Sequence, residues 1–306
     1  YKEQWDDLIS DSRNGTFLFY RDYMDYHSDR FKDCSFLIFM KGKVVGVIPG
    51  NIDNNRFISH QGLTYGGLIA SQNIDLKRTI EVFDLLDKEL ILLGIQEVIY
   101  KPVPLIYHMI PSQEDIYVLF LKKAEKLGCN ISSSIFQKNK ISFNESRKSG
   151  LRKSMRKGIR VSESSDFSGF WNILEDNLTY KYGVKPVHSL SEIELLASRF
   201  PNNIKLYVAE YDGSIIAGTV LFSMKNIIHV QYISANEQGK DNGALDLLFD
   251  NLINQTFLHI PIFDFGQSSE KMGNYLNENL IFQKEGFGGR GTVYETYKYN
   301  LSQNDY

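Results

Sequence analysis

The chain has 306 residues, which is room for about two domains of ordinary size. Hydrophobic residues make up 42% and charged residues 23%, as in a globular protein that buries a large core. The net charge of −3 gives no overall positive field for nucleic acid or a membrane surface, and two cysteines exclude a disulfide scaffold. No apolar run approaches the ~20 residues of a membrane-spanning helix, so we expect a cytoplasmic protein.

The first half begins with helical patterns and then a hairpin. Residues 36–46, FLIFMKGKVVG, predict two strands joined at Lys41-Gly42, because glycine accepts the positive φ of a tight turn. The other predicted elements, in chain order, are helices Trp5–Ile9 and Phe19–His27, strand Arg56–His60, loop Gln61–Leu68, helix Leu76–Leu93, strand Glu97–Tyr100, a helix ending at Lys126-Leu127-Gly128 and strand Ile131–Phe136.

The second half repeats this order. Residues 207–217, YVAEYDGSIIA, form the second predicted hairpin, 171 residues after the first. The flanking predictions are helices Phe167–Tyr182 and Leu190–Arg199, strand Ile227–Ile233, loop Asn236–Gly243, helix Ala244–Leu258, strand Ile262–Phe265, a helix ending at Lys284-Glu285-Gly286 and strand Thr292–Tyr299. We therefore expect two copies of one α/β domain, a mixed sheet with packed helices, at residues 1–143 and 144–306, with a cleft between them.

A dense basic stretch follows the predicted domain join. Seven Lys and Arg lie in the fourteen residues 147–160, RKSGLRKSMRKGIR. On a helix, Lys148, Arg152 and Arg156 share one face. Since guanidinium groups grip phosphate bidentately, Arg152 and Arg156 are candidates to bind a phosphate-containing ligand or an RNA backbone. The alternative interpretation is a solvated helix face.

A glycine-containing loop in the first half is a second candidate site. It reads SHQGLTYGGL at 59–68, and Gly66 and Gly67 let the backbone approach a ligand, with Gln61 beside them. His60 and Tyr65 are candidates for proton transfer. The alternative is a tight turn with a buried tyrosine.

Polar residues also follow the buried strand of the second half. Asp264, Gln267 and Ser268 lie at its end, where α/β sheets bind ligands. Asp264 is equally interpretable as a structural cap. Tyr182 and His188 belong to a polar and aromatic stretch between two helices that suits the lining of a cleft, or His188 and Ser189 cap the following helix.

Several classes of site are excluded by the absence of their motifs. No GxGxxG, P-loop, HExxH or GxSxG pattern occurs, neither cysteine belongs to a CxxC motif, and the six histidines lack ligand spacing. We therefore expect no metal site.

The order of these elements resembles the GNAT acyltransferase fold. Its duplication, together with QGLTYGG at 61–67, the basic stretch, DFGQSS at 264–269 and FQKEGF at 282–287, is similar to the FemABX-like group, which includes the aminoacyltransferases of peptidoglycan cross-bridges. The resemblance implies tandem GNAT-like domains and an N-acyltransferase in which an amine attacks an activated acyl carbonyl directly.

The resemblance also implies roles for individual residues. Lys284 matches a lysine that stabilises the developing oxyanion, the loop at 65–67 matches the acceptor-binding loop, and Arg152 and Arg156 match phosphate-facing cations. Lys126 occupies the equivalent position of the first copy, so Lys284 is also interpretable as a helix-end lysine.

Departures from the family pattern leave the general base and the donor open. The loop is followed by apolar Leu68-Ile69-Ala70 instead of an acidic residue, so His60 or the substrate would act as base. The Q/R-x-x-G-x-G/A pyrophosphate cradle and the tRNA-binding helical hairpin are not matched. We expect acyl-CoA or aminoacyl-tRNA as donor and an amine of a small-molecule or nucleotide-linked cell-envelope precursor as acceptor. The alternative is an inactive duplication that binds a nucleotide sugar or a protein, and the oligomeric state stays open.

Overall fold

The computed structural model describes residues 1–301, apart from the side chains of residues 181 and 182. These residues form two compact units. Unit 1 comprises residues 1–131, 269–276 and the chain from 293 onward, and unit 2 comprises 132–268 and 277–292. Strands β8 (Glu125–Phe136) and β16 (Arg290–Asn300) each give residues to both units. The domain limits 1–143 and 144–306 stay a prediction.

Unit 1 is a mixed sheet with the strand order β1-β4-β5-β7-β16-β8, beside a small sheet β2-β3-β6. Its elements are α1 (Lys2–Asp11), η1 (Phe17–Phe19), α2 (Arg21–Met24), η2 (Asp25–His27), β1 (Lys32–Asp33), β2 (Phe36–Met40), β3 (Lys43–Ile48), β4 (Asn51–Asp53), β5 (Arg56–Ile58), β6 (Ile69–Ala70), α3 (Leu76–Leu92), β7 (Glu97–Tyr100), η3 (Leu105–Tyr107), α4 (Glu114–Leu121), β14 (Ser269–Glu270), η6 (Lys271–Gly273) and β15 (Tyr275–Leu276). The periodic apolar face of α3 explains its place, because Phe83, Leu86 and Leu90 are buried in the core against β7.

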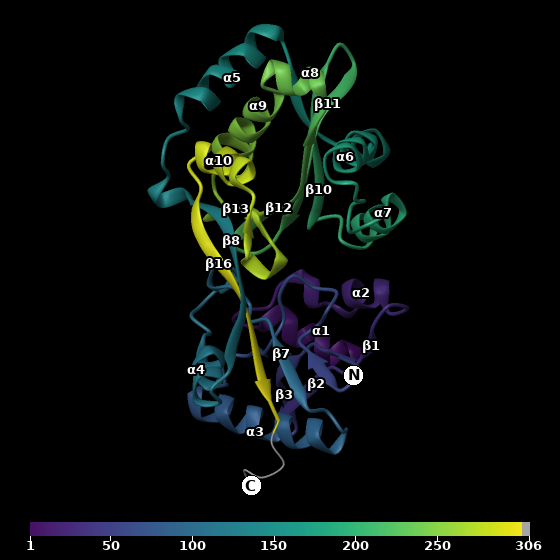
Figure 1. Cartoon of the computed structure of the whole chain (residues 1–306), viewed down its shortest axis with the longest axis vertical. Helices are drawn as coiled ribbons and strands as arrows, with labels where there is room; N and C mark the ends of the chain where they lie inside the picture. The colour runs from purple at the N-terminus through teal and green to yellow at the C-terminus, as the bar shows by residue number, and fades with distance from the viewer. Residues whose placement is uncertain (302–306) are drawn as a thin grey trace. The chain divides into compact units, whose positions relative to one another are not determined.

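Unit 2 contains strands in the order β16-β8-β13-β12-β11-β10-β9. Its elements are η4 (Gln137–Asn139), α5 (Glu145–Lys157), β9 (Arg160–Ser164), α6 (Phe167–Tyr182), α7 (Leu190–Arg199), β10 (Ile204–Tyr211), β11 (Ser214–Ser223), β12 (Ile227–Ala235), α8 (Glu237–Asn242), α9 (Ala244–Asn251), a π-helical turn η5 (Leu252–Thr256), β13 (Ile262–Gln267) and α10 (Glu278–Gly286). Helices α6 and α7 cover one face of β10–β12 and α9 covers the other (Figure 1). Phe249 of α9 and Phe263 of β13 pack in the core between them.

The predicted mixed α/β architecture is confirmed, and both hairpins form at the expected turns. One prediction about the repeat is wrong: Lys126-Leu127-Gly128 lies in strand β8 and does not end a helix. Helix α4 ends at Leu121, Lys123 takes a φ of 55°, and the chain enters β8 at Glu125. Lys126 is thus a strand residue and no counterpart of Lys284.

Two further segments differ from expectation. The predicted loop 236–243 contains helix α8, because the Asn236 side chain accepts from Gly239 N at 2.9 Å and Gly243 ends the helix with a φ of 69°. The predicted helix 19–27 is divided into short turns and a four-residue helix α2. Among the residues that the structure describes, no helix combines the length and the apolarity needed to cross a bilayer.

Candidate active site

A fully buried carboxylate marks the end of β13 in unit 2. Asp264 accepts hydrogen bonds from Ser132 Oγ at 2.6 Å, from Ser134 Oγ at 2.8 Å and from His229 Nδ1 at 2.8 Å. Burial alone would raise its pKa, but the hydrogen bonds from His229 and the two serines outweigh burial and hold the pKa of Asp264 below its usual value. Asp264 is therefore an ionised acceptor, so His229 Nδ1 carries the proton of their hydrogen bond.

Lys284 lies within electrostatic range of this carboxylate. From α10 its Nζ donates to Gly266 O and to Gln267 O, both at 2.8 Å, and the side chain is 4% exposed. Burial lowers the pKa of Lys284 to about 8, and the charge of Asp264 opposes that shift. An ammonium has three N–H groups, so one remains beyond these two carbonyls. Lys284 is a buried cation held at a strand end.

The backbone of β13 turns at this point. Gly266 has a φ of 73°, in the left-handed region that favours glycine. An ideal Cβ at Gly266 would lie 3.2 Å from His229 Cε1 and 3.7 Å from its Nε2. The register between β13 and β8 shifts between Asp264 and Gln267. This bulge turns the carbonyls of residues 266 and 267 toward Lys284.

The two central parallel strands separate at the same place. β12 and β13 pair over three residues, and His229 with Asp264 is the last pair within the described chain. Beyond it β12 continues along β11 to Ala235, while Gln267 of β13 pairs with Ser132. The side chains of Gln231 and Gln267, beyond the last pair, are half-buried. Asp264, His229 and Lys284 thus meet where two strands diverge.

In unit 1, a loop covers the end of the parallel strand pair β5 and β7, which corresponds to β12 and β13 of unit 2. β5 and β7 also run parallel over three residues, and Ile58 with Ile99 is the last pair. Ser59 N then donates to Ile99 O at 2.9 Å, and Ser59 Oγ accepts from Lys101 N at 2.7 Å. Gly66 N donates to Lys101 O at 2.7 Å. Loop residues therefore occupy the place where the strands diverge.

Lys101 fixes this loop by donating to two backbone carbonyls, in the same way as Lys284 fixes the bulge of β13. Its Nζ donates to the carbonyls of His60, at 2.8 Å, and Leu63, and burial lowers the pKa of Lys101 to about 8. His60 is 4% exposed, and its φ of 54° is unusual for a residue with a side chain. Burial first, then the charges of neighbouring His27 and Lys101, lower the pKa of His60 to about 3. His60 is a neutral ring at physiological pH.

The rest of the loop is similarly fixed. Tyr65 is 2% exposed and packs among aromatic rings, and Gln61 N donates to Asn51 Oδ1 at 2.6 Å. Gly67 has a φ of 77°, and an ideal Cβ there would lie 2.6 Å from Tyr100 Oη. The glycine is therefore required for close packing of this loop on β7.

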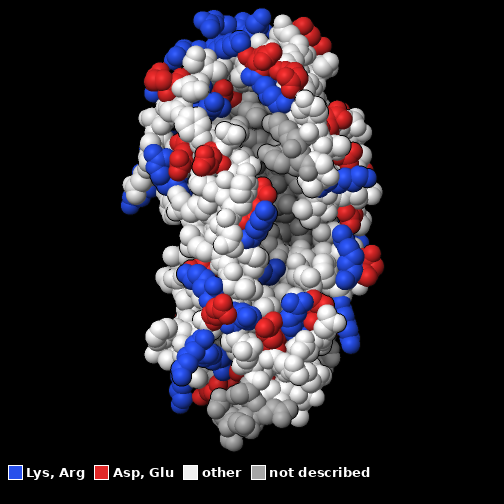
Figure 2. Space-filling model, in the orientation of Figure 1, with Lys and Arg blue, Asp and Glu red and all other residues white. Residues whose placement is uncertain are grey.

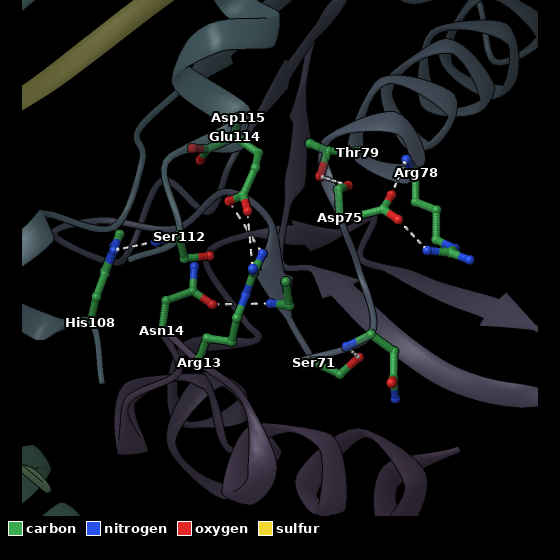
Figure 3. Close-up of polar contacts among 12 residues, drawn as sticks. Arg13, Asn14, Ser71, Asp75, Arg78, Thr79, His108, Ser112, Glu114 and Asp115 are labelled. Atoms are coloured by element: carbon green, nitrogen blue, oxygen red, sulfur yellow. Dashed lines mark hydrogen bonds and ion pairs between the residues drawn. The ribbon is translucent and has the colours of Figure 1, made fainter. Parts of the chain in front are cut away.

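The N-terminal segment anchors the far end of the loop. Asn14 Nδ2 donates to Leu68 O at 2.9 Å, and Ala70 N donates to Asn14 Oδ1 at 3.0 Å. Figure 3 shows the adjacent Arg13 reaching Glu114, with which it forms a two-pronged ion pair at 3.0 and 3.2 Å. The loop of unit 1 is a tightly held structural element.

Three further predicted residues of unit 2 are His188, Ser268 and Tyr182. His188 Nδ1 lies 2.6 Å from Tyr232 Oη and is buried, and Ser189, not His188, caps α7 with its side chain. Ser268 is 1% exposed, and its Oγ has no hydrogen-bond partner among the described residues. Tyr182 ends α6, and its side chain lies outside the described residues.

The basic stretch forms helix α5, as predicted. Figure 2 shows Lys and Arg side chains gathered where Figure 1 draws α5. Arg152 is 60% exposed and lies 3.9 Å from Glu145, while Arg156, Lys157 and Arg160 are exposed. The outer face of α5 is therefore a solvated cationic surface, to which Lys148 contributes through its pair with Glu145.

The inner face of α5 covers the first turn of α9. An ideal Cβ at Gly150 would lie 1.7 Å from Asp246 Oδ2, and one at Gly243 would lie 2.6 Å from Gly150 O. Arg147 Nη1 pairs with Asp246 Oδ1 at 2.9 Å. Burial raises the pKa of Asp246 to about 6, against the lowering effect of Arg147. The start of α9 is thus closed by protein and carries a carboxylate.

Sequence reasoning missed His229, Ser132 and Ser134. The only local signal for His229 is a polar residue inside an otherwise apolar strand, IIHVQYI at 227–233. The two serines lie about 130 residues before Asp264, and only the pairing of β8 with β13 brings them to it.

The sequence matches no family model and no curated protein. Solved structures show similarity of fold. FemX is similar with a TM-score of 0.72 and 11% identity, over 99% of this chain and 96% of that chain. The C-terminal domain of a putative lysylphosphatidylglycerol synthetase from Agrobacterium fabrum gives a TM-score of 0.60 and 13% identity, over 99% and 92%.

A tandem GNAT protein from the clavulanic acid biosynthesis pathway is also similar, with a TM-score of 0.55 and 10% identity, over 99% of this chain and 96% of that chain. At these identities the similarity concerns the fold alone. The predicted FemABX-like, tandem-GNAT fold is confirmed.

Proposed function

We propose that the protein is an N-acyltransferase whose reaction takes place in unit 2, where β12 and β13 separate. The observation that carries this proposal is the buried ammonium of Lys284, fixed by two backbone carbonyls beside the ionised Asp264. The fold shared with FemX and with a tandem GNAT protein supports the same reaction class.

In this proposal Lys284 stabilises the oxyanion. When an amine attacks an acyl carbonyl, negative charge develops on the carbonyl oxygen. A preorganised cation in a dry site stabilises that charge without reorganising, and the third N–H of Lys284 is available for it. A pKa of about 8 keeps most of the Lys284 population charged at neutral pH.

The surroundings of α9 support an aminoacyl ester of tRNA as the donor over acyl-CoA. A pyrophosphate would favour the N-terminus of a helix that follows the central strand. The helix directly after β12 is α8, which has six residues and whose Gly239 N already donates to Asn236 Oδ1. The N-terminus of the longer α9 is covered by Gly150 and carries Asp246, which is mainly ionised at neutral pH. Phosphates of RNA instead suit the outer face of α5, with Arg152 and Arg156. The acceptor would be the amine of a nucleotide-linked envelope precursor.

Transfer to a simple nucleophile tests the proposal. We would incubate the protein with total bacterial tRNA charged with radiolabelled amino acids, or with acetyl-CoA, each in the presence of hydroxylamine. We expect labelled hydroxamate to form from charged tRNA faster than in the same mixture without protein, and no acceleration of thiol release from acetyl-CoA. Thiol release without transfer from tRNA would contradict the donor assignment. If the protein is inactive with both donors, the result would contradict an enzymatic function and favour a nucleotide-sugar or protein binding module.

A further inference from the structure

We propose that His229 accepts the proton of the attacking amine and that Asp264 positions it; this inference rests on the proposed transferase function. His229 lies on β12 at its last paired position with β13, and its side chain is 13% exposed. It is thus the histidine placed at the strand divergence where Lys284 also lies.

The hydrogen bond to Asp264 fixes the tautomer of His229. Asp264 is fully buried and ionised, so its Oδ2 only accepts, and His229 Nδ1 donates to it at 2.8 Å. Ser132 and Ser134 both donate to the other oxygen and hold the carboxylate in orientation. With Nδ1–H donating to Asp264, the unprotonated form of the ring has its lone pair on Nε2, where a general base needs it.

Gly266 lies beside both His229, the proposed base, and Lys284, the cation proposed to stabilise the oxyanion. The Cε1–Nε2 edge of His229 runs beside Gly266, at 3.2 and 3.7 Å from an ideal Cβ. The carbonyl of that same glycine accepts from Lys284 Nζ at 2.8 Å. A proton acceptor and a cation thus flank one residue, which is the arrangement that aminolysis requires on the two sides of a reacting carbonyl.

The step balances as a transfer from an ester. The amine nitrogen forms a bond to the acyl carbon and gives its proton to His229 Nε2. Lys284 stabilises the tetrahedral oxyanion, the bond between the acyl carbon and the ribose oxygen then breaks, and His229 returns the proton to that oxygen. The products are an amide and a ribose hydroxyl.

The other histidine with a predicted catalytic role does not suit this step. His60 has a pKa of about 3, so it would hold a proton too weakly to assist an amine near neutral pH. Lys101 donates to its backbone carbonyl only to hold the loop of unit 1.

The test is His229→Ala, with imidazole added back to the medium, in the hydroxylamine assay with charged tRNA. Exposed His259 of the same unit provides the matched control His259→Ala. We expect a 10²- to 10⁴-fold loss of turnover for His229→Ala, with unchanged tRNA binding, at least tenfold recovery with imidazole, and less than a twofold effect for His259→Ala.

Folding is controlled with His229→Asn, whose amide Nδ2 takes the position of the ring Nδ1 and retains a donor toward Asp264. An Asn variant with the wild-type Tm and the same loss of turnover supports the proposal. An active wild type whose His229 variants keep turnover within threefold, or recover nothing with imidazole, would overturn the role of His229 alone. An inert wild type would instead contradict the transferase function, and this role with it.

Discussion

The two units use a buried lysine in the same way but with different neighbours. Lys101 and Lys284 each donate to two backbone carbonyls at the end of a parallel strand, and burial lowers the pKa of each to about 8. Only Lys284 has an ionised carboxylate beside it, since Asp264 raises its pKa against burial. Unit 1 uses its lysine to close a loop over the strand end, whereas unit 2 keeps a charged cluster there.

A buried carboxyl in each unit also differs in its charge state: the pKa of Asp115 in unit 1 is raised, and that of Asp264 in unit 2 is lowered. Asp115 of unit 1 receives a hydrogen bond from Tyr100 Oη at 2.9 Å and one from its neighbouring backbone, and burial raises its pKa to about 6. Asp264 receives donors from two serines and a histidine, and its pKa is lowered. The comparison teaches that burial depth does not decide the charge of a carboxyl; the number and kind of its donors do.

The largest effect is expected from the pair Lys284→Met and Lys101→Met. Removing one oxyanion donor costs about 10²–10³ in kcat, so Lys284→Met should lose turnover in the hydroxylamine assay by that factor. Lys101→Met should unfold more easily in urea because it frees the carbonyls of His60 and Leu63, yet retain kcat in the folded fraction. Equal losses of kcat in the two variants would contradict the assignment of chemistry to unit 2.

A pH effect on stability separates the two acids. The pKa of Asp115 rises from 3.8 in the unfolded chain to about 6 in the folded one, so its contribution to stability falls as pH rises through this window, by about 3 kcal/mol. Asp115→Asn should remove that fall from the profile of unfolding free energy between pH 4 and 6, measured with urea.

Asp264→Asn should change the pH profile of the unfolding free energy in the opposite direction to Asp115→Asn, because it removes a contribution that grows as the pH rises. Its folded pKa is depressed, so its stabilisation is present above pH 3.8 and disappears as the pH falls below that value. Parallel profiles for the wild type and either variant would show that the corresponding carboxyl has the same pKa in both states.

A smaller effect is expected from Gly266→Ala, with Gly213→Ala as the matched control. Both glycines have a φ near 73°, so each alanine should cost about 1 kcal/mol of unfolding free energy from left-handed strain. An added Cβ at Gly213 meets nothing within 4 Å, whereas one at Gly266 presses on His229. Only Gly266→Ala should therefore lower turnover. A similar loss of turnover in both variants would contradict a role of the bulge at Gly266 in the reaction.

The smallest effect should come from the surface of α5. Arg156→Gln removes one phosphate contact, so tRNA affinity should drop severalfold and the slope of log K against log salt should decrease by about 0.9. Lys43→Gln, an exposed cation of unit 1, should change neither quantity. Fluorescence anisotropy measures both quantities. An unchanged salt dependence in Arg156→Gln would contradict the binding of RNA to the outer face of α5.

Much of the fold could be predicted because it depends on local patterns. Helices α6 and α7 begin and end at the predicted residues, since Asp166 and Ser189 cap them and their apolar faces are periodic. The limits of β8 could not be predicted, because residues 125–128 are ordered as a strand by pairing with residues distant in sequence, as in the ion pair of Lys126 with Glu295.

The candidate site was predicted only in part for the same reason. Asp264 carries a visible sequence signal, a polar residue at a strand end, whereas Lys284 was predicted from the resemblance of FQKEGF at 282–287 to the FemABX-like group. His229 becomes meaningful only through its parallel register with Asp264, and the positions of Ser132 and Ser134 depend on an antiparallel pairing across about 130 residues. The burial of the loop at 61–67 likewise depends on Tyr100 of β7 and on Lys101, which follows that strand.

A crystal structure with 3′-aminoacylamino-3′-deoxyadenosine, an amide that mimics the ester donor and does not react, would test whether acyl transfer takes place in unit 2. We expect its carbonyl oxygen within hydrogen-bond distance of Lys284 Nζ, between β12 and β13. Density for the aminoacyl group beside Lys101 and His60 in unit 1 would contradict a site in unit 2.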